Sequence, residues 1–157
     1  MKITILAALN ASALLLAVAV PAIGADGLTV GQCIEVYNGL SVLNHYDDPV
    51  TGKPRQYKLG GSARLTIALD LSVLKSVVDS TDKARTGLIE EIMVGKPIVP
   101  NSPEFVKLNN EYQKVLSASC PVTPGHLDIK DMKIGDGDGD NAIPPDVIAA
   151  IVPILDR

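Results

Sequence analysis

The chain has 157 residues, with 18 Asp and Glu against 14 Lys and Arg and a formal net charge of −4 at pH 7. Proteins that bind a phosphate backbone take their affinity from clustered cations, and the stacking of bases or sugars needs exposed aromatic rings. Because the chain is acidic and has four Tyr, one Phe and no Trp, its composition excludes nucleic acid as a general partner.

The N-terminal residues have the pattern of a secretory leader. Lys2 precedes an apolar run over residues 3–20, and a proline and small residues up to Ala25 follow the run. Polar residues interrupt the run, so we expect cleavage after Ala25 rather than retention as a membrane anchor. Residues 1–25 are therefore predicted to be a signal peptide. Residues 26–157 are predicted to be a single helical domain, exported to the periplasm or the extracellular medium without stable membrane insertion.

The fold class predicted from periodicity is mainly α. We expect a three-helix arrangement around one long central helix, with a short C-terminal helix and room for a small two-stranded β element. The predicted helices are residues 28–43, 63–94, 103–119 and 144–157.

Cap residues and apolar spacing support these helix boundaries. Thr29 is the expected cap of the first helix, and Ser102 followed by Pro103 marks the start of the third. In the long helix, Ile67 and Leu71 begin an apolar stripe with steps of three and four residues. A bend at most is expected where polar residues near position 80 compete for backbone hydrogen bonds.

Two segments have the character of short strands or turns. Residues 45–58 contain two prolines and a Thr-Gly pair, which suit a turn or a short hairpin. Residues 125–134, GHLDIKDMKI, have strand character. The segment Gln56–Leu59 is the partner we expect for this second strand.

Two cysteines, Cys33 and Cys120, follow the leader. An even count in an exported protein predicts one disulfide, with two separate buried thiols as the alternative. The predicted layout agrees, because a central helix of about 48 Å is roughly twice as long as each neighbour. The first helix would pack along its leading half and the third along its trailing half, which brings both cysteines near its middle.

The stretch IGDGDGDNAIPPD, residues 134–146, resembles the first half of an EF-hand calcium loop. Asp136, Asp138 and Asp140 would occupy positions 1, 3 and 5. Position 12 falls on Val147, which cannot ligate, so the usual bidentate acid is missing. Two readings stay open: a calcium site built on the three aspartates, and a flexible acidic connector.

No segment carries a catalytic signature. The patterns GxSxG, HExxH and the P-loop are not present in the sequence. The chain has two histidines, His45 and His126, and neither has a second ligand at helical spacing. We therefore assign no catalytic residue and no cofactor other than the calcium ion considered above.

The order of several segments is similar to a group of phage proteins. YKLGG, the KAR of the long helix, PEFVKLNNEYQKVL, IKDMKI and IPPDVIAAIVPIL follow one another along the chain. This order resembles small helical proteins of unknown function encoded by tailed phages and prophages. The resemblance implies a compact accessory or structural protein without catalytic residues. The leader and the cysteine pair depart from that pattern.

Together these observations predict an exported, non-catalytic helical binding or accessory protein that is stabilised by one disulfide and has a protein partner. One alternative is an extracytoplasmic calcium-responsive module that uses the loop at residues 136–146. A second alternative is a small hydrolase whose active site is assembled from residues far apart in the sequence.

The calcium hypothesis can be tested by thermal melts at constant ionic strength. A site with a dissociation constant of about 10⁻⁴ to 10⁻³ M raises stability by about 1.4 to 2.7 kcal/mol at about 10 mM calcium. Magnesium should do less because it demands a tighter octahedral shell. Asp138→Asn should reduce the calcium effect and leave the unliganded protein almost unchanged. Identical melts in chelator and in calcium would identify the segment as a connector.

Overall fold

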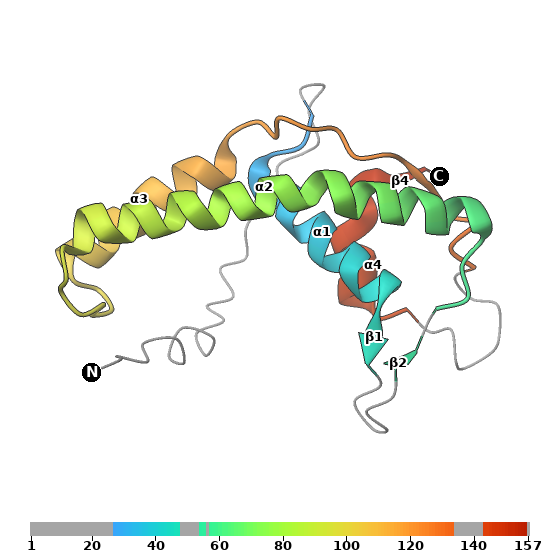
Figure 1. The fold of residues 1–157 in the computed structure, drawn as a ribbon, viewed down its shortest axis with the longest axis horizontal. Coiled ribbons are helices and arrows are strands. Elements are labelled where there is room, and N and C mark those ends of the chain that lie inside the picture. The colour runs from blue at the N-terminus through green and yellow to red at the C-terminus, as the bar shows by residue number, and fades with distance from the viewer. Residues whose placement is uncertain (1–26, 48–53, 56, 134–142, 157) are drawn as a thin grey trace.

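The computed structural model describes residues 27–47, 54–55, 57–133 and 143–156. The predicted signal peptide lies outside these residues. The described chain is mainly helical, as predicted, and one helix is much longer than the others (Figure 1). The helices are α1 (Val30–Asn44), α2 (Gly61–Met93), α3 (Pro103–Ser117) and α4 (Pro145–Ile151), and a 3₁₀ turn, η2 (Val152–Ile154), follows α4.

The caps that were expected at the starts of α1 and α3 are present. Thr29 and Gln32 form a capping box, in which the Thr29 hydroxyl accepts from the Gln32 amide at 3.2 Å and the Gln32 side chain accepts from the Thr29 amide at 2.9 Å. At α3, the Ser102 hydroxyl accepts from the amide of Phe105 at 3.1 Å, and Pro103 occupies the first turn. These caps satisfy amides that a helix start otherwise leaves without partners.

Helix α2 runs through its polar stretch without interruption. Thr81 is buried, and its hydroxyl donates to the carbonyl of Val77 at 2.8 Å. The side chain therefore finds its partner within the helix instead of competing with the helical ladder. Helix α2 is continuous from Gly61 to Met93.

The strands are short and form two pairs. Strand β1 (Tyr46–Asp47) pairs antiparallel with β2 (Pro54–Arg55), so the hairpin expected within residues 45–58 is present. Strand β3 (Leu127–Asp128) pairs in parallel with β4 (Leu155–Asp156).

The partner predicted for the strand in residues 125–134 is therefore wrong. The 3₁₀ turn η2 ends at Ile154 and brings the following residues of β4 beside β3. The segment that was expected to pair, Gln56–Leu59, instead turns its described residues Tyr57 and Leu59 into the core. A two-residue strand leaves no periodic signal from which its partner could be read.

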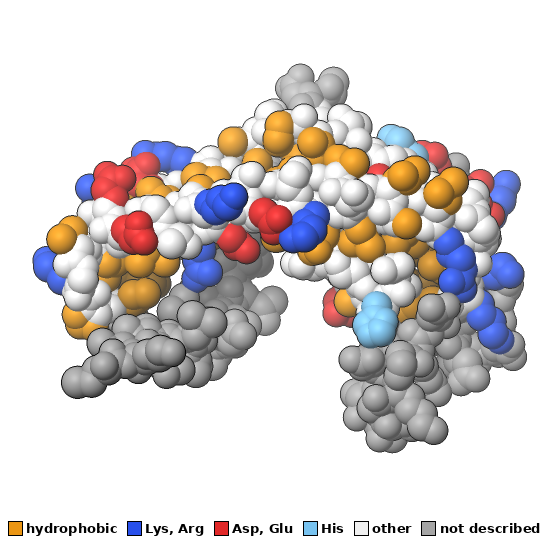
Figure 2. Space-filling model, in the orientation of Figure 1, with side chains coloured by type: hydrophobic (Ala, Val, Ile, Leu, Met, Phe, Trp, Pro, Cys, Tyr) orange, Lys and Arg blue, Asp and Glu red, His pale blue; other side chains and the backbone are white. Residues whose placement is uncertain are grey.

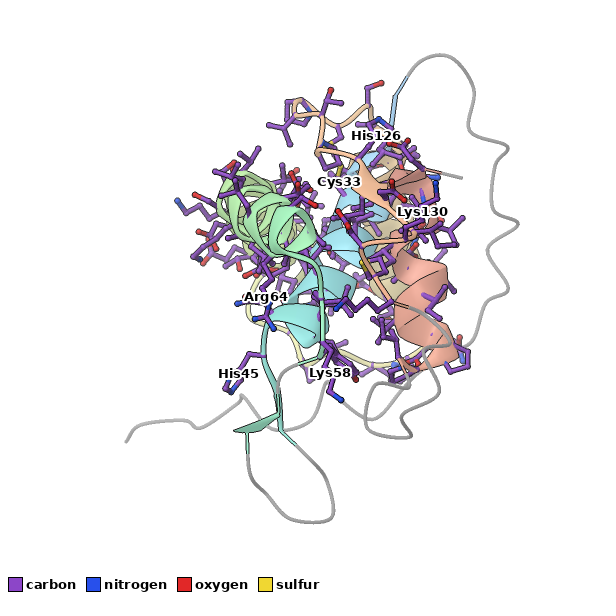
Figure 3. All side chains as sticks on the ribbon, turned by 90° about the vertical axis from the view of Figure 1, so that its right-hand side faces the viewer. Cys33, His45, Lys58, Arg64, His126 and Lys130 are labelled. Carbon is purple, nitrogen blue, oxygen red and sulfur yellow. The ribbon has the colours of Figure 1, made fainter. Side chains whose placement is uncertain are left out.

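The main core forms around α1, which lies between α2 and α4 (Figure 3). Helix α1 contributes residues to both of these contacts, and its Gly39 allows α4 to approach closely. A Cβ atom at Gly39 would lie 2.9 Å from Cγ2 of Ile151 and 3.1 Å from Cβ of Ala150. The largest fully buried side chains of the core are Leu40, Ile67, Leu74, Leu127, Met132, Ile151 and Ile154.

A second, smaller apolar cluster lies away from this core. It consists of Ile92, Met93 and Leu108, where α3 packs against the C-terminal half of α2. The guanidinium carbon of Arg85 also lies 5.9 Å from the centre of the Tyr112 ring, a cation–π distance. We call residues 78–117 the arm, because they form a two-helix hairpin whose tip extends away from α1 and α4 (Figure 1). At the other end of the arm, Leu116 of α3 packs against the main core.

The close packing of α1 on α4 predicts opposite effects for two glycine-to-alanine substitutions. Gly39→Ala places a Cβ against α4. Its free energy of unfolding should therefore be about 1 to 3 kcal/mol lower than that of Gly87→Ala. Gly87→Ala, in α2, places its new Cβ within 4 Å of no described atom beyond its chain neighbours and its own helix backbone, and it should raise stability by up to about 1 kcal/mol through helix propensity. Urea unfolding measures both. Equal stabilities of the two variants would contradict the packing.

Candidate functional site

The tip of the arm is the loop that connects α2 to α3, residues 94–102. Val94 and Asn101 both adopt left-handed backbone conformations, with φ of 43° and 64°. This region suits Asn and Gly but is unusual for a β-branched residue such as Val. The side chain of Val94 is nevertheless 74% exposed. The tip thus holds an apolar side chain in solvent on a strained backbone.

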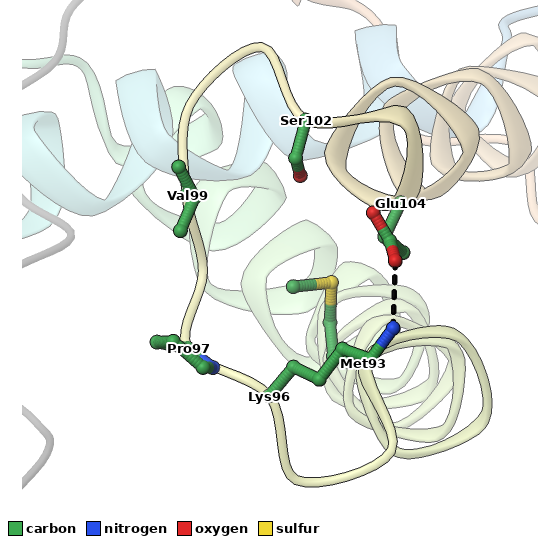
Figure 4. Close-up of a pocket in the computed structure, with 6 residues that line it drawn as sticks. All are labelled: Met93, Lys96, Pro97, Val99, Ser102 and Glu104. Atoms are coloured by element: carbon green, nitrogen blue, oxygen red, sulfur yellow. Dashed lines mark hydrogen bonds and ion pairs between the residues drawn. The ribbon is translucent and has the colours of Figure 1, made fainter.

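A cavity of about 200 Å³ lies beside this loop (Figure 4). The side chain of Met93 points into the space that the loop encloses, and that of Val99 lines the opposite side (Figure 4). The residues that line the cavity are Met93, Lys96, Pro97, Val99, Ser102 and Glu104. Apart from the charged pair and the serine, its walls are therefore apolar.

The polar groups of the cavity are engaged with one another or with the backbone. Nζ of Lys96 lies 2.8 Å from Oε1 of Glu104, and this hydrogen bond lowers the pKa of Glu104. The hydroxyl of Ser102 accepts from the amide of Phe105 as the cap of α3. These lining residues include no cysteine, histidine or aspartate. With its charged groups paired and its serine engaged as a cap, the cavity is suited to receive an apolar group.

Exposed apolar residues lie in the tip loop and the first turn of α3, and one of them, Val99, lines the cavity. Val94, Val99 and Val106 are all exposed on the arm, and hydrophobic side chains are visible at its end in Figure 2. Single exposed apolar residues are common on protein surfaces, whereas a group of them beside a cavity marks an interaction site. The arm tip is the candidate binding surface.

The two cysteines meet where α1 and α3 adjoin the middle of α2. Cys33 is 1% exposed in α1, and its side chain approaches that of Cys120 to 2.5 Å. Burial and the neighbouring Cys120 raise the pKa of the Cys33 thiol. The residues are two free cysteines in the structure, and a disulfide sulfur–sulfur bond is about 2.05 Å long. The layout predicted for them is present, and their bridge stays a prediction.

Backbone hydrogen bonds also hold this junction. The amide of Val30 donates to the carbonyl of Ala118 at 2.9 Å, and the amide of Cys120 donates to the carbonyl of Leu28 at 2.7 Å. An isolated β-bridge joins Thr29 to Ser119. The start of α1 and the end of α3 are thus fastened together without the sulfur atoms.

A buried carboxylate was not identified from the sequence. Asp70 of α2 is 5% exposed, and its Oδ1 accepts from the amide of Gly125 at 2.8 Å. Among the residues that the structure describes, its Oδ2 has no hydrogen-bond partner. Asp70 lies three residues after Ile67 and four before Leu74, so helical spacing alone placed it on the buried face.

The surroundings of Asp70 shift its pKa in opposite directions. Burial raises the pKa, whereas the hydrogen bond from Gly125 and the positive charge of His126 lower it, and the net shift is upward. His126 is exposed, and its Nδ1 lies 3.2 Å from Oδ1 of Asp156. His126 therefore interacts both with Asp70, through its charge, and with Asp156 of β4.

The remaining candidates do not form a joint site in the described residues. Asp136, Asp138 and Asp140 lie outside those residues. His45, at the end of α1, lies far from His126 on the opposite side of the molecule (Figures 2 and 3). Within the described ranges there is no group of three or more His, Cys, Asp or Glu side chains that could hold a metal ion.

Comparisons with protein families, with curated proteins and with solved structures find no match to this chain. The resemblance to phage proteins therefore stays a prediction. Among the described residues, no helix has both the length and the apolar character needed to span a membrane.

Proposed function

We propose that the protein is an exported, non-catalytic helical binding protein and that the tip of its arm contacts a protein partner. The observation that carries this proposal is the cavity of about 200 Å³ surrounded by exposed apolar residues at the end of a projecting hairpin. Water disfavours such a surface, and the strained backbone at Val94 adds a further cost, of order 1 to 3 kcal/mol. A partner that covers the tip offsets the first of these costs.

The lining of the cavity defines the chemistry of the partner. An apolar side chain, presented by a peptide loop or a helix, would insert beside Met93 and Val99. The thioether of Met93 can adapt to side chains of different shapes. The ion pair of Lys96 and Glu104 stands at the edge, where it would meet polar groups of the partner.

We also propose that Cys33 and Cys120 form a disulfide in the exported protein. The bridge would join the start of α1 to the segment after α3, at the base of the arm. The direction of the arm relative to the core would then be covalently fixed. A binding surface that is held in one orientation loses less conformational entropy on association.

Replacement of Val94 separates binding from stability. Val94→Asn removes the exposed apolar side chain and introduces a residue that tolerates the left-handed backbone. We expect the variant to be about 1 kcal/mol more stable and to bind the partner more weakly. The partner is captured by a photo-crosslinking amino acid at Val99 in the producing cell, and the yield of the same crosslinked product is compared with and without the substitution.

Leu65→Gln is the matched control for this experiment. Leu65 is exposed on the outer face of α2, far along the helix from the tip, so its replacement should leave the crosslinked product unchanged. If Val94→Asn crosslinks as well as the unmodified chain, or if Leu65→Gln reduces crosslinking as much, the tip is not the binding surface.

The disulfide predicts a defined peptide map and a change in stability. Non-reducing digestion of the exported protein should join the peptides of Cys33 and Cys120. The bridge closes a loop that corresponds to about 4 to 5 kcal/mol in the chain-entropy model, so reduction should lower the melting temperature by several degrees. A double variant, Cys33→Ala with Cys120→Ala, should melt at the same temperature with and without reductant. Two alkylated thiols in the native exported protein would contradict the bridge.

A further inference from the structure

The segment after α3 runs along α2 and is fastened at three places. We call residues 120–128 the strap. Its first amide, at Cys120, donates to the carbonyl of Leu28, and its last residues form β3 with β4. Between these ends, the amide of Gly125 donates to Asp70. The middle fastening therefore depends on a side chain that can gain or lose a proton.

The strap lies directly against α2 at this point. A Cβ atom on Gly125 would lie 3.1 Å from Cγ2 of Thr66 and 3.4 Å from Oδ1 of Asp70. Next to Gly125, Pro124 is buried, and Val122 packs against the main core. The closed strap thus shields both the carboxyl group of Asp70 and an apolar surface.

Because Oδ2 of Asp70 is buried without a hydrogen-bond donor, the site favours the neutral carboxylic acid over the carboxylate. A buried carboxylate oxygen without a donor loses its hydration and gains nothing in return. In the acid form, the Oδ2 hydroxyl is itself a donor.

The charged and titratable groups around Asp70 come from several elements. The strap contributes His126, whose positive charge favours the carboxylate form of Asp70. Strand β4 contributes Asp156, which pairs with His126 and weakens that influence. The thiols of α1 and the strap are Cys33 and Cys120, and the nearest acid–base pair along α2, Lys75 with Asp79, is exposed and joined at 2.9 Å.

We propose that Asp70 is a proton-operated latch: in its protonated form it keeps the strap closed on α2, and its ionisation favours a state in which the strap has lifted and water reaches the carboxylate. The lifted state exposes Val122 and Pro124. This device is independent of the arm tip and of the binding function proposed for it.

The direction of the pH dependence follows from proton linkage. Burial raises the pKa of Asp70 above its ordinary value, so the closed state binds the proton more tightly than a state in which Asp70 is hydrated. The strap is therefore tightest below about pH 4, the ordinary value for Asp. It opens progressively as the pH rises through the raised pKa and changes no further above it.

Amide hydrogen exchange of the full chain, followed by NMR from about pH 3.5 to 7.5, tests the latch. Protection factors are corrected for the intrinsic effect of pH on exchange. That of the Gly125 amide should fall by up to about tenfold per pH unit between the ordinary and the raised pKa of Asp70, and it should then level off. In Asp70→Asn, whose amide oxygen can still accept from Gly125, the protection factor should not change with pH.

Asp82→Asn, which replaces an exposed acid of the same helix, is the matched control and should retain the profile of the unmodified chain. The latch is refuted if the Gly125 protection factor of the unmodified chain is independent of pH. It is equally refuted if Asp70→Asn shows the same fall as the unmodified chain. The first of these outcomes needs no variant, so it decides the question even if Asp70→Asn does not fold.

Discussion

The difference in helix length is the constraint on which the rest of the structure depends. Helix α2 has 33 residues, whereas α1 and α3 have 15 each. At about 1.5 Å per residue, α2 is long enough for the two shorter helices to pack along it one after the other. The molecule therefore has two apolar clusters, one around α1 and one between α2 and α3. Helix α4 completes the first cluster by covering the other face of α1, and the second cluster remains a two-helix hairpin.

This arrangement places a junction at the middle of α2. The start of α1 and the end of α3 meet there, and main-chain hydrogen bonds from Val30 and Cys120 join them. The junction joins the core to the arm, because α3 reaches the main core at its C-terminal end, where Leu116 packs against the core residues. A disulfide between Cys33 and Cys120 would lie at this junction and would fix the arm relative to the core.

Much of the helical fold could be predicted because its boundaries are local. The caps at Thr29 and Ser102 lie within the few residues that they serve, and the apolar spacing of α2 is carried by the helix itself. The meeting of the cysteines followed from helix lengths, which are also local quantities. The partner of β3 could not be predicted, since two-residue strands are paired by the path of the whole chain.

The two sites depend on features that a hydrophobic pattern does not register. In α2, the pattern favoured Leu71 as a member of the buried stripe, whereas Asp70 is buried and Leu71 is only partly so. Hydrophobicity alone could not rank an acid above its apolar neighbour, although the helical spacing allowed it. At the arm tip, the left-handed backbone of Val94 was not indicated by its residue type, because β-branched residues rarely adopt this conformation.

Cys120 belongs both to the predicted disulfide and to the strap. The strap begins at Cys120, where the arm ends, and the latch acts five residues later at Gly125. With Cys120 bridged to Cys33, lifting of the strap at Gly125 would stop at the bridge, and the base of the arm would keep its position. With both thiols reduced, only non-covalent contacts would oppose the movement, among them the hydrogen bonds from Cys120 to Leu28 and from Val30 to Ala118, and each such bond contributes about 1 kcal/mol. The oxidation state of the pair would therefore decide whether ionisation of Asp70 moves only the strap or also the base of the arm.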